Sequence, residues 1–228
     1  MTAQAPPLYL ILSSGMNAHN PLEFALTAAA TGLIGHIQIR DKDIADDQTL
    51  AFARALRDGL NALDAANHLK LLLNDRVDLA VKLGASIIDG VHLGQGDGSP
   101  ADARAQLGKD AVIGLTIKTP AHIDAADFPN LDYICIGGIF DTSSKINPDP
   151  PVGLDGLTAM VKQAKARCPE MPIGAIAGIN QSNIGQIAGC AVDFAAIISA
   201  LSGASSLDQV PSAAQALYRE FMAGQSKE

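Results

Sequence analysis

The sequence predicts a single α/β domain folded as a closed parallel barrel of eight strands and helices, the (β/α)₈ TIM-barrel architecture. The chain has 228 residues, which is long for one ordinary domain and short for two but fits one barrel. Eight short apolar runs recur along it, most of them separated by helix-like stretches. Hydrophobic residues make up 48% of the chain and charged residues 18%, so a large core can form and disorder is not expected.

Each apolar run has the length of a strand and ends at polar or glycine-rich residues. Strands that alternate with helices pair in parallel through right-handed crossovers, so their sheet is either covered on both faces or closed on itself. An open doubly wound sheet is the less favoured alternative, because a single glycine follows the first run where G-x-G-x-x-G would be needed. The expected strands are 8–12, 36–40, 70–74, 90–94, 111–117, 133–139, 173–179 and 194–201.

Helical spacing of apolar residues is clearest over 46–66, 152–168 and 206–223, whereas 119–128 is too short and polar to predict a full helix. We assign the barrel to residues 1–222 and expect 223–228 to form a disordered tail. Aromatic residues are only 4% of the chain and Trp is absent, so Ala, Leu, Ile and Val are expected to fill the interior.

The net charge of −8 argues against nucleic acid or an anionic membrane as the main partner. The three cysteines contain no C-x-x-C pair, which predicts reduced thiols rather than disulfides or a zinc site. The amino-terminal residues include no basic region and no long apolar run, so we expect no signal peptide and a cytoplasmic protein. A homo-oligomer stays open.

In a barrel, functional side chains are expected where strands end, because the loops that follow the strands gather on one face. In the second run, period-two alternation puts His36, Gln38, Arg40 and Lys42 on one side. We expect these polar residues to line the lumen and its mouth.

The third run ends in Asn74 and Asp75, and two interpretations are equally open. Asp75 can cap a helix that begins near Val77, because Asp is a favoured N-cap residue. It can equally bind a ligand. The fourth run leads into a glycine-rich loop with Asp97, and we interpret His92 as a satisfied core or lumen histidine rather than a metal ligand.

Phosphate-binding features follow the later runs. The fifth ends with Thr116 and Lys118, and the sixth is followed by three hydroxyls and Lys145 in a loop long enough to be a lid. Gly178 and the backbone around Ser199 are typical of the phosphate cradle that barrels build after strands seven and eight.

Four basic side chains and two carboxylates thus follow the predicted strands of a protein whose net charge is negative. Mg²⁺ takes one or two protein carboxylates and fills its other positions with water and substrate phosphates. Asp75 and Asp97 therefore predict a Mg²⁺ site beside a polyphosphate. The cations are Arg40, Lys42, Lys118 and Lys145.

Several motifs in order make the chain resemble the thiamine phosphate synthase (thiamine-phosphate pyrophosphorylase) family over nearly its whole length. They are Q-I-R-D-K at 38–42, NDRVDLA at 74–80, GVHLGQGD at 90–97, DTSSK at 141–145, PPVGLDGL at 150–157, AIAGI at 175–179 and IISAL at 197–201. Serine stands in the lid where a second threonine is usual, Thr116 replaces a usual serine, Lys118 stands near a usual histidine, and Ala177 replaces the first of two glycines.

The resemblance implies the joining of an aminomethylpyrimidine diphosphate to a hydroxyethylthiazole phosphate, with release of pyrophosphate. It implies that Asp75 and Asp97 hold Mg²⁺, and that Arg40 and Lys145 are catalytic. The pyrimidine diphosphate would be bound by Gln38, Arg40, Lys42, Asn74, Thr116 and Lys145. The thiazole phosphate would be bound by Thr142, Ser144, Gly178, Ile198 and Ser199.

Two other functions remain open from the sequence. One is isomerisation of a thiazole carboxylate phosphate by a related branch of the fold, with His92 or His122 as a general base. The retained metal and diphosphate residues disfavour it. The other is a binding protein for thiamine precursors that has lost turnover.

Overall fold

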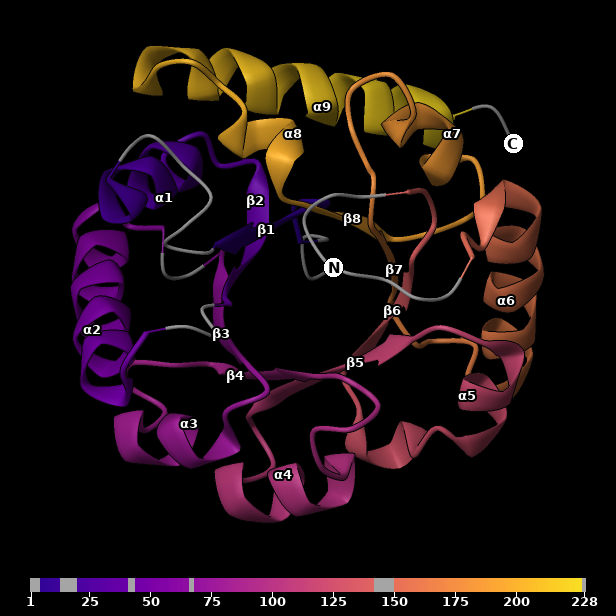
Figure 1. Ribbon diagram of the computed structural model, residues 1–228, viewed down its shortest axis with the longest axis horizontal. Coiled ribbons are helices and arrows are strands. Elements are labelled where there is room, and N and C mark those ends of the chain that lie inside the picture. The colour runs from indigo at the N-terminus through magenta and orange to yellow at the C-terminus, as the bar shows by residue number, and fades with distance from the viewer. Residues whose placement is uncertain (1–4, 13–19, 41–43, 66–67, 142–149, 227–228) are drawn as a thin grey trace.

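The computed structural model describes residues 5–12, 20–40, 44–65, 68–141 and 150–226, and it confirms the closed barrel (Figure 1). Each strand pairs in parallel with the next, and the eighth pairs in parallel with the first, which excludes the open sheet. The strands are β1 (Leu8–Leu12), β2 (Ile34–Ile39), β3 (Lys70–Asn74), β4 (Gly90–Leu93), β5 (Val112–Ile117), β6 (Tyr133–Gly137), β7 (Ile173–Ile176) and β8 (Phe194–Ile197).

Helices form a ring outside the strands, and α9 packs across α7 and α8 (Figure 1). No helix within the described ranges is long and apolar enough to cross a membrane. The helices are α1 (Pro21–Ala29), α2 (Asp46–Ala62), α3 (Val77–Leu83), α4 (Pro100–Leu107), α5 (Pro120–Ala125), η1 (Phe128–Asn130), α6 (Gly153–Arg167), α7 (Ile184–Ala188), α8 (Ser199–Ser202), η2 (Leu207–Gln209) and α9 (Val210–Gln225).

Two boundaries differ from those expected. The run 194–201 splits, because β8 ends at Ile197 and α8 begins at Ser199. The disordered tail predicted over 223–228 is wrong for its first residues, since α9 continues to Gln225. Gly224 is buried there against the backbone of Gly185, so the end of α9 is held by packing.

Three helices begin with the same two-residue signal, a capping residue followed by proline. The cap side chain accepts a hydrogen bond from a backbone N–H of the first turn, and proline is tolerated next because its position has no intrahelical donor to lose. The pairs are Asn20-Pro21 before α1, Ser99-Pro100 before α4 and Thr119-Pro120 before α5.

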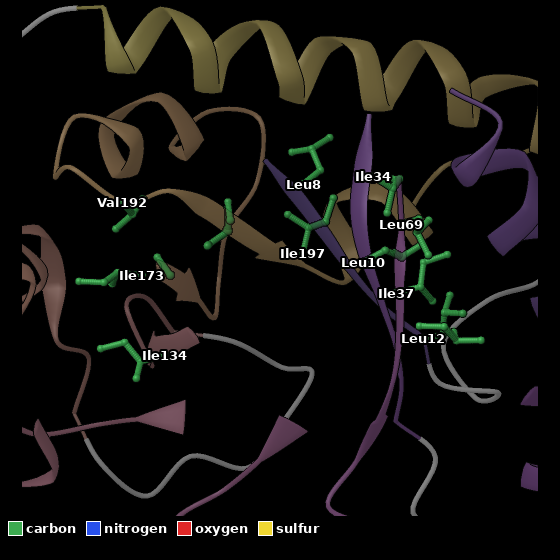
Figure 2. Packing of buried hydrophobic residues seen from close by; sticks show 14 of the residues in the cluster. Leu8, Leu10, Leu12, Ile34, Ile37, Leu69, Ile134, Ile173, Val192 and Ile197 are labelled. Carbon is green, nitrogen blue, oxygen red and sulfur yellow. The ribbon is translucent and has the colours of Figure 1, made fainter. Parts of the chain in front are cut away.

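Alternation along each strand divides the buried residues into two layers. In β1, Leu8, Leu10 and Leu12 point outward to the main hydrophobic core, whereas Tyr9 and Ile11 belong to a second cluster inside the barrel. Figure 2 shows the outward layer, in which residues of several strands pack between the sheet and the helices. One strand therefore stabilises both the helix-covered core and the lumen.

Aliphatic side chains fill the outer layer as expected, but the expectation is wrong for the lumen. Aromatic rings of Tyr9, His36, Tyr133 and Phe194 pack there, with centroids 5.1 to 5.9 Å apart. Glycines on neighbouring strands make the room. A Cβ at position 114 would lie 2.0 Å from the Tyr133 ring, and one at position 174 would lie 2.1 Å from the Phe194 ring.

Aspartates placed directly before β4, β6 and β8 form three repeated clamps at the amino-terminal ends of the strands. Each donates its backbone N–H to the carbonyl of a residue in the preceding strand and accepts that residue's N–H on its carboxylate. Each carboxylate also pairs with a basic side chain from an even-numbered helix. The clamps are Asp89 with Leu71 and Arg57, Asp132 with Ile113 and Arg104, and Asp193 with Ile173 and Lys165.

Arg57→Ala should lower the free energy of unfolding by about 3 kcal/mol, the lower end of the range for breaking a buried ion pair. Arg57 is only 6% exposed. The remaining Asp89 carboxylate keeps Lys70 at 3.6 Å, which moderates the loss. Chemical denaturation measures the change.

Arg54→Ala is the matched control, because Arg54 lies on the same helix but is exposed. It should change stability by no more than about 0.5 kcal/mol. Equal losses in the two variants would show that the clamp around Asp89 is not a source of stability.

Candidate active site

The residues predicted at strand ends share one rim of the barrel, because all eight strands run in the same direction. Arg40 follows β2 and Asp97 follows β4, so the prediction that they lie at the same end is confirmed. The other described members are Asn74, Asp75, Thr116, Gly178, Ile198 and Ser199. The predicted residues Lys42, Thr142, Ser144 and Lys145 lie outside the described part of the chain.

A short chain of hydrogen bonds leads from the lumen to the first predicted metal ligand. Gln38 is only 1% exposed and lies beneath the rim. Its Nε2 donates to Oδ1 of Asn74 over 2.9 Å, and Nδ2 of Asn74 donates to Oδ2 of Asp75 over 2.5 Å. The two amides are therefore aligned head to tail, and the series ends on a carboxylate, as expected for polar groups on the inward face of β2 and β3.

Asp75 lies at the turn between the end of β3 and the start of α3. Its φ is +63°, in the left-handed region that Asp tolerates better than most residues, and its N–H donates to the carbonyl of His92 over 2.9 Å. The N-cap position of α3 is occupied by Arg76, one residue later. The capping interpretation of Asp75 is therefore disfavoured, and its side chain belongs to the rim between β3 and β4.

Arg76 points away from this rim. Its guanidinium makes two hydrogen bonds to Asp46 at the start of α2, of 2.7 and 2.9 Å, and two more to Asp78. These bonds hold the pKa values of both carboxyls below their usual range. Arg76 therefore ties α2 to the segment that carries Asp75, without entering the site.

Asp97 folds back over the end of β4. Its Oδ2 accepts the N–H of Gly94 over 3.0 Å, and a Cβ at position 94 would lie 2.4 Å from that oxygen. A side chain at position 94 would therefore displace the Asp97 carboxylate from this position. Nε2 of Gln95 donates to the carbonyl of Thr116 over 2.7 Å, which ties the same loop to β5.

The carboxylates of Asp75 and Asp97 fit a Mg²⁺ ion held partly by its substrate. They stand on adjacent strand ends, and each is oriented by an N–H bond to its Oδ2. Among the described residues, no group of three or more His, Cys, Asp or Glu could hold a metal. Two carboxylates, with water and phosphate oxygens completing the shell, are the set that Mg²⁺ accepts.

A second hydrogen-bonded chain connects the lumen to Thr116. Nε2 of His92 lies 2.8 Å from Oγ1 of Thr116, and Nδ1 lies 2.8 Å from Oη of Tyr133, which is 2.9 Å from Oη of Tyr9. His92 is a buried lumen histidine, as predicted. Sequence reasoning missed both tyrosines, although their alternation on β1 and β6 already marked positions facing the lumen.

The predicted phosphate cradle forms one small cavity. Gly178, Ile198 and Ser199 line it together with Ala177, and its volume is about 20 Å³. Gly178 has a φ of +69°, and a Cβ there would lie 2.6 Å from the carbonyl oxygen of Asp141. The glycine is therefore needed both for its backbone angle and for space.

Basic groups also gather at the rim. The N–H of Arg40 donates to the carbonyl of Leu12 over 2.7 Å, which fixes its backbone where β1 and β2 end. Within the described ranges the Arg40 guanidinium has no ion-pair partner. On the far side of the rim, the N–H of Lys118 donates to Nδ1 of His122 over 3.3 Å. The absence of a carboxylate partner for Arg40 among the described residues favours an anionic ligand there.

A barrel with cations, paired carboxylates and a glycine cradle on its carboxyl-terminal rim is typical of enzymes that act on phosphorylated substrates. The family model described as thiamine monophosphate synthase matches residues 8–201. The chain belongs to this family.

The relatives agree with that assignment. A thiamine-phosphate synthase from Agrobacterium fabrum is 41% identical over 185 residues, covering 81% of this chain and 80% of that protein. One from Leptospira biflexa is 36% identical over 201 residues, covering 86% and 90%. A solved structure of thiamine phosphate pyrophosphorylase from Pyrococcus furiosus has a TM-score of 0.77 at 25% identity, covering 96% of this chain and 98% of that one.

Ala177→Gly should raise the free energy of unfolding by about 0.5–1 kcal/mol. Ala177 has a φ of +87°, where a side chain costs about 1–2 kcal/mol. Part of that gain is offset by the larger unfolded-state entropy of glycine. Denaturant titration measures the difference.

Ala191→Gly provides a matched control far from the cradle, since Ala191 also has a positive φ of +58° and is exposed. Both substitutions should stabilise the protein. A loss of stability in Ala177→Gly alone would mean that the Ala177 methyl group contributes packing that outweighs its strain.

Proposed function

We propose that this chain is a thiamine-phosphate synthase. It condenses 4-amino-2-methyl-5-(diphosphooxymethyl)pyrimidine with 4-methyl-5-(2-phosphoethyl)thiazole, or its carboxylate form, and releases pyrophosphate. The observation that carries the proposal is the joint position of Arg40, Asp75 and Asp97 on the rim of a barrel from the thiamine monophosphate synthase family. These are the residues that a diphosphate leaving group needs.

The reaction is a substitution at the methylene carbon of the pyrimidine. The C–O bond breaks and its electron pair leaves with the diphosphate, and the thiazole nitrogen donates its lone pair to form the new C–N bond. The transferase needs little acid–base work from the protein; it must neutralise the leaving group and position the nucleophile. Arg40, without an ion-pair partner among the described residues, suits the first task.

Asp75 and Asp97 would hold Mg²⁺ in this proposal. The ion, when bound, supplies positive charge to the diphosphate oxygens. Asn74 orients Asp75, and the backbone of Gly94 orients Asp97, so the protein sets the direction of both carboxylates before any ligand arrives.

The cradle of Gly178, Ile198 and Ser199 would receive the thiazole phosphate. It lies after β7 and β8, whereas Asp75 and Asp97 follow β3 and β4, so the two phosphorylated substrates approach from opposite sides of the rim. We assign Lys42, Thr142, Ser144 and Lys145 to substrate binding, and Lys145 also to catalysis, by their places in the family motifs. A cytoplasmic location and a homo-oligomer stay predictions.

The isomerase alternative needs a histidine base that faces the substrate. His92 is 6% exposed, and its two ring nitrogens lie within hydrogen-bond distance of Tyr133 and Thr116. Nδ1 of His122 accepts the N–H of Lys118. These contacts favour the synthase over the isomerase.

A pyrophosphate-release assay with both substrates tests the proposed function. Release should require the pyrimidine diphosphate, the thiazole phosphate and Mg²⁺ together, and thiamine phosphate should form in equal amount. Chelation of the metal should abolish both products. Binding of the substrates without release would identify a binding protein, and isomerisation of a thiazole carboxylate phosphate without release would identify the isomerase.

Asp75→Asn tests the metal site separately. Removing one negative charge from the pair should weaken the apparent Mg²⁺ affinity by at least about tenfold, the effect commonly seen when even a supporting residue is changed. Thermal stability should stay almost constant, because Asn also tolerates the positive φ of +63° at this position. Activity measured over a Mg²⁺ titration gives the result.

Asp78→Asn makes the same chemical change three residues away, on an exposed side chain that pairs with Arg76. It should leave the Mg²⁺ dependence unchanged. If Asp75→Asn matched this control in rate and metal dependence, Asp75 would be a turn residue and not a ligand.

A further inference from the structure

We propose that His92 is a positioning residue that turns the hydroxyl hydrogen of Thr116 toward the rim, where Thr116 donates to an anionic substrate oxygen. The family resemblance places Thr116 in the diphosphate site, so the identity of the anion rests on the proposed function. The orientation itself follows from the buried hydrogen-bonded chain of Tyr9, Tyr133, His92 and Thr116, named here the lumen relay.

The lumen relay brings together four strands. Tyr9 comes from β1, Tyr133 from β6, His92 from β4 and Thr116 from β5, and three contacts of 2.8 to 2.9 Å join them in that order. Tyr9 and Tyr133 are 1% and 3% exposed. The inner end of the relay is therefore shielded from bulk solvent.

The direction of the relay is set at Tyr9. Burial raises the pKa of both phenols, so each keeps its proton and has one hydrogen to donate. Among the described residues, Oη of Tyr133 is the hydrogen-bond partner of the Tyr9 hydroxyl. A buried donor without an acceptor is strongly avoided in proteins. Tyr9 therefore donates to Tyr133.

That choice fixes every later hydrogen in the relay. Tyr133 accepts from Tyr9 and donates its own hydrogen to Nδ1 of His92. His92 must then be neutral with its proton on Nε2, and this N–H donates to Oγ1 of Thr116. The hydroxyl hydrogen of Thr116 is left pointing away from His92, as a donor available to a ligand at the rim.

The opposite direction leaves an unpaired hydrogen. If Nδ1 of His92 carried a proton, it would donate to Tyr133, Tyr133 would donate to Tyr9, and the Tyr9 hydrogen would have no acceptor. A doubly protonated His92 has the same consequence. Both states place an unsatisfied donor in the lumen, so the neutral Nε2–H tautomer is favoured.

The orientation matters because diphosphate oxygens only accept hydrogen bonds. A Thr116 hydroxyl that donated inward to His92 would present oxygen lone pairs to the anion and repel it. With His92 donating, the same hydroxyl attracts it. The lumen relay thus determines whether the Thr116 hydroxyl attracts or repels the diphosphate.

The tautomer is measured directly by ¹⁵N NMR of the histidine rings in the unliganded wild-type protein. The His92 resonances are assigned by their loss in His92→Asn. We expect a protonated Nε2 and an unprotonated Nδ1. A protonated Nδ1 on His92 would overturn the proposal, whatever the enzyme's activity.

Tyr133→Phe and Tyr9→Phe form a matched pair, each deleting one buried hydroxyl. Tyr133→Phe removes the donor to Nδ1, so the Nε2–H population should fall and part of Thr116 should turn inward. Tyr9→Phe leaves Tyr133 able to donate to His92, so the tautomer should not change. Circular dichroism confirms that both variants are folded.

Calorimetric titration with inorganic pyrophosphate and Mg²⁺ provides the binding measurement. Tyr133→Phe should weaken pyrophosphate binding by about tenfold, as expected for the loss of one hydrogen bond to a charged group, and Tyr9→Phe should bind like wild type. Equal weakening by both variants would show a packing effect and overturn the proposal. If the wild-type protein made no thiamine phosphate but showed the expected tautomer and binding pattern, the proposed function would fail and the role of His92 would stand.

Discussion

Closure of the sheet by the pairing of β8 with β1 is the constraint on which the site depends. Because all strands run in parallel around a closed barrel, residues far apart in the sequence meet on one rim. Arg40, Asp97 and Ser199 lie on one rim because the barrel is closed, although they are far apart in the sequence. An open sheet of the same strands would separate the residues after β3 and β4 from those after β7 and β8. The loops carry the polar side chains of the rim, and closure of the barrel brings these loops together.

In the lumen, the same strands carry both the aromatic packing and the hydrogen-bonded chain that leads to the rim. Its lower part is filled by the rings of Tyr9, His36, Tyr133 and Phe194, which pack as an aromatic layer. The hydroxyls and imidazole of the upper part are hydrogen-bonded to one another. A fully satisfied polar chain is tolerated in a low-dielectric core and resists rearrangement. The residues of the rim are therefore supported from below by a hydrogen-bonded, rigid lumen.

Periodicity predicted the barrel, and the rule for parallel strands predicted its functional rim, because both depend on local patterns. The lumen relay could not be predicted, because the contact between Tyr9 and Tyr133 joins residues 124 positions apart and depends on the register of four strands. The positive φ of Ala177 and Asp75 also had no signal in the sequence. The aspartate before each of β4, β6 and β8 was a signal that could have been read, since the same residue recurs at the same place in three strands.

The three aspartate clamps have a consequence for how the barrel assembles. Each joins residues only 18 to 20 positions apart, so β3–β4, β5–β6 and β7–β8 can fix their alignment from nearby contacts, before the chain ends meet. The pair β1–β2 has no such aspartate, and it is the pair whose alignment shifts, between Leu8 and Tyr9. The barrel thus contains three βαβ units whose parallel strands are aligned by a local clamp, whereas the alignment of β1 with β2 depends on the neighbouring strands.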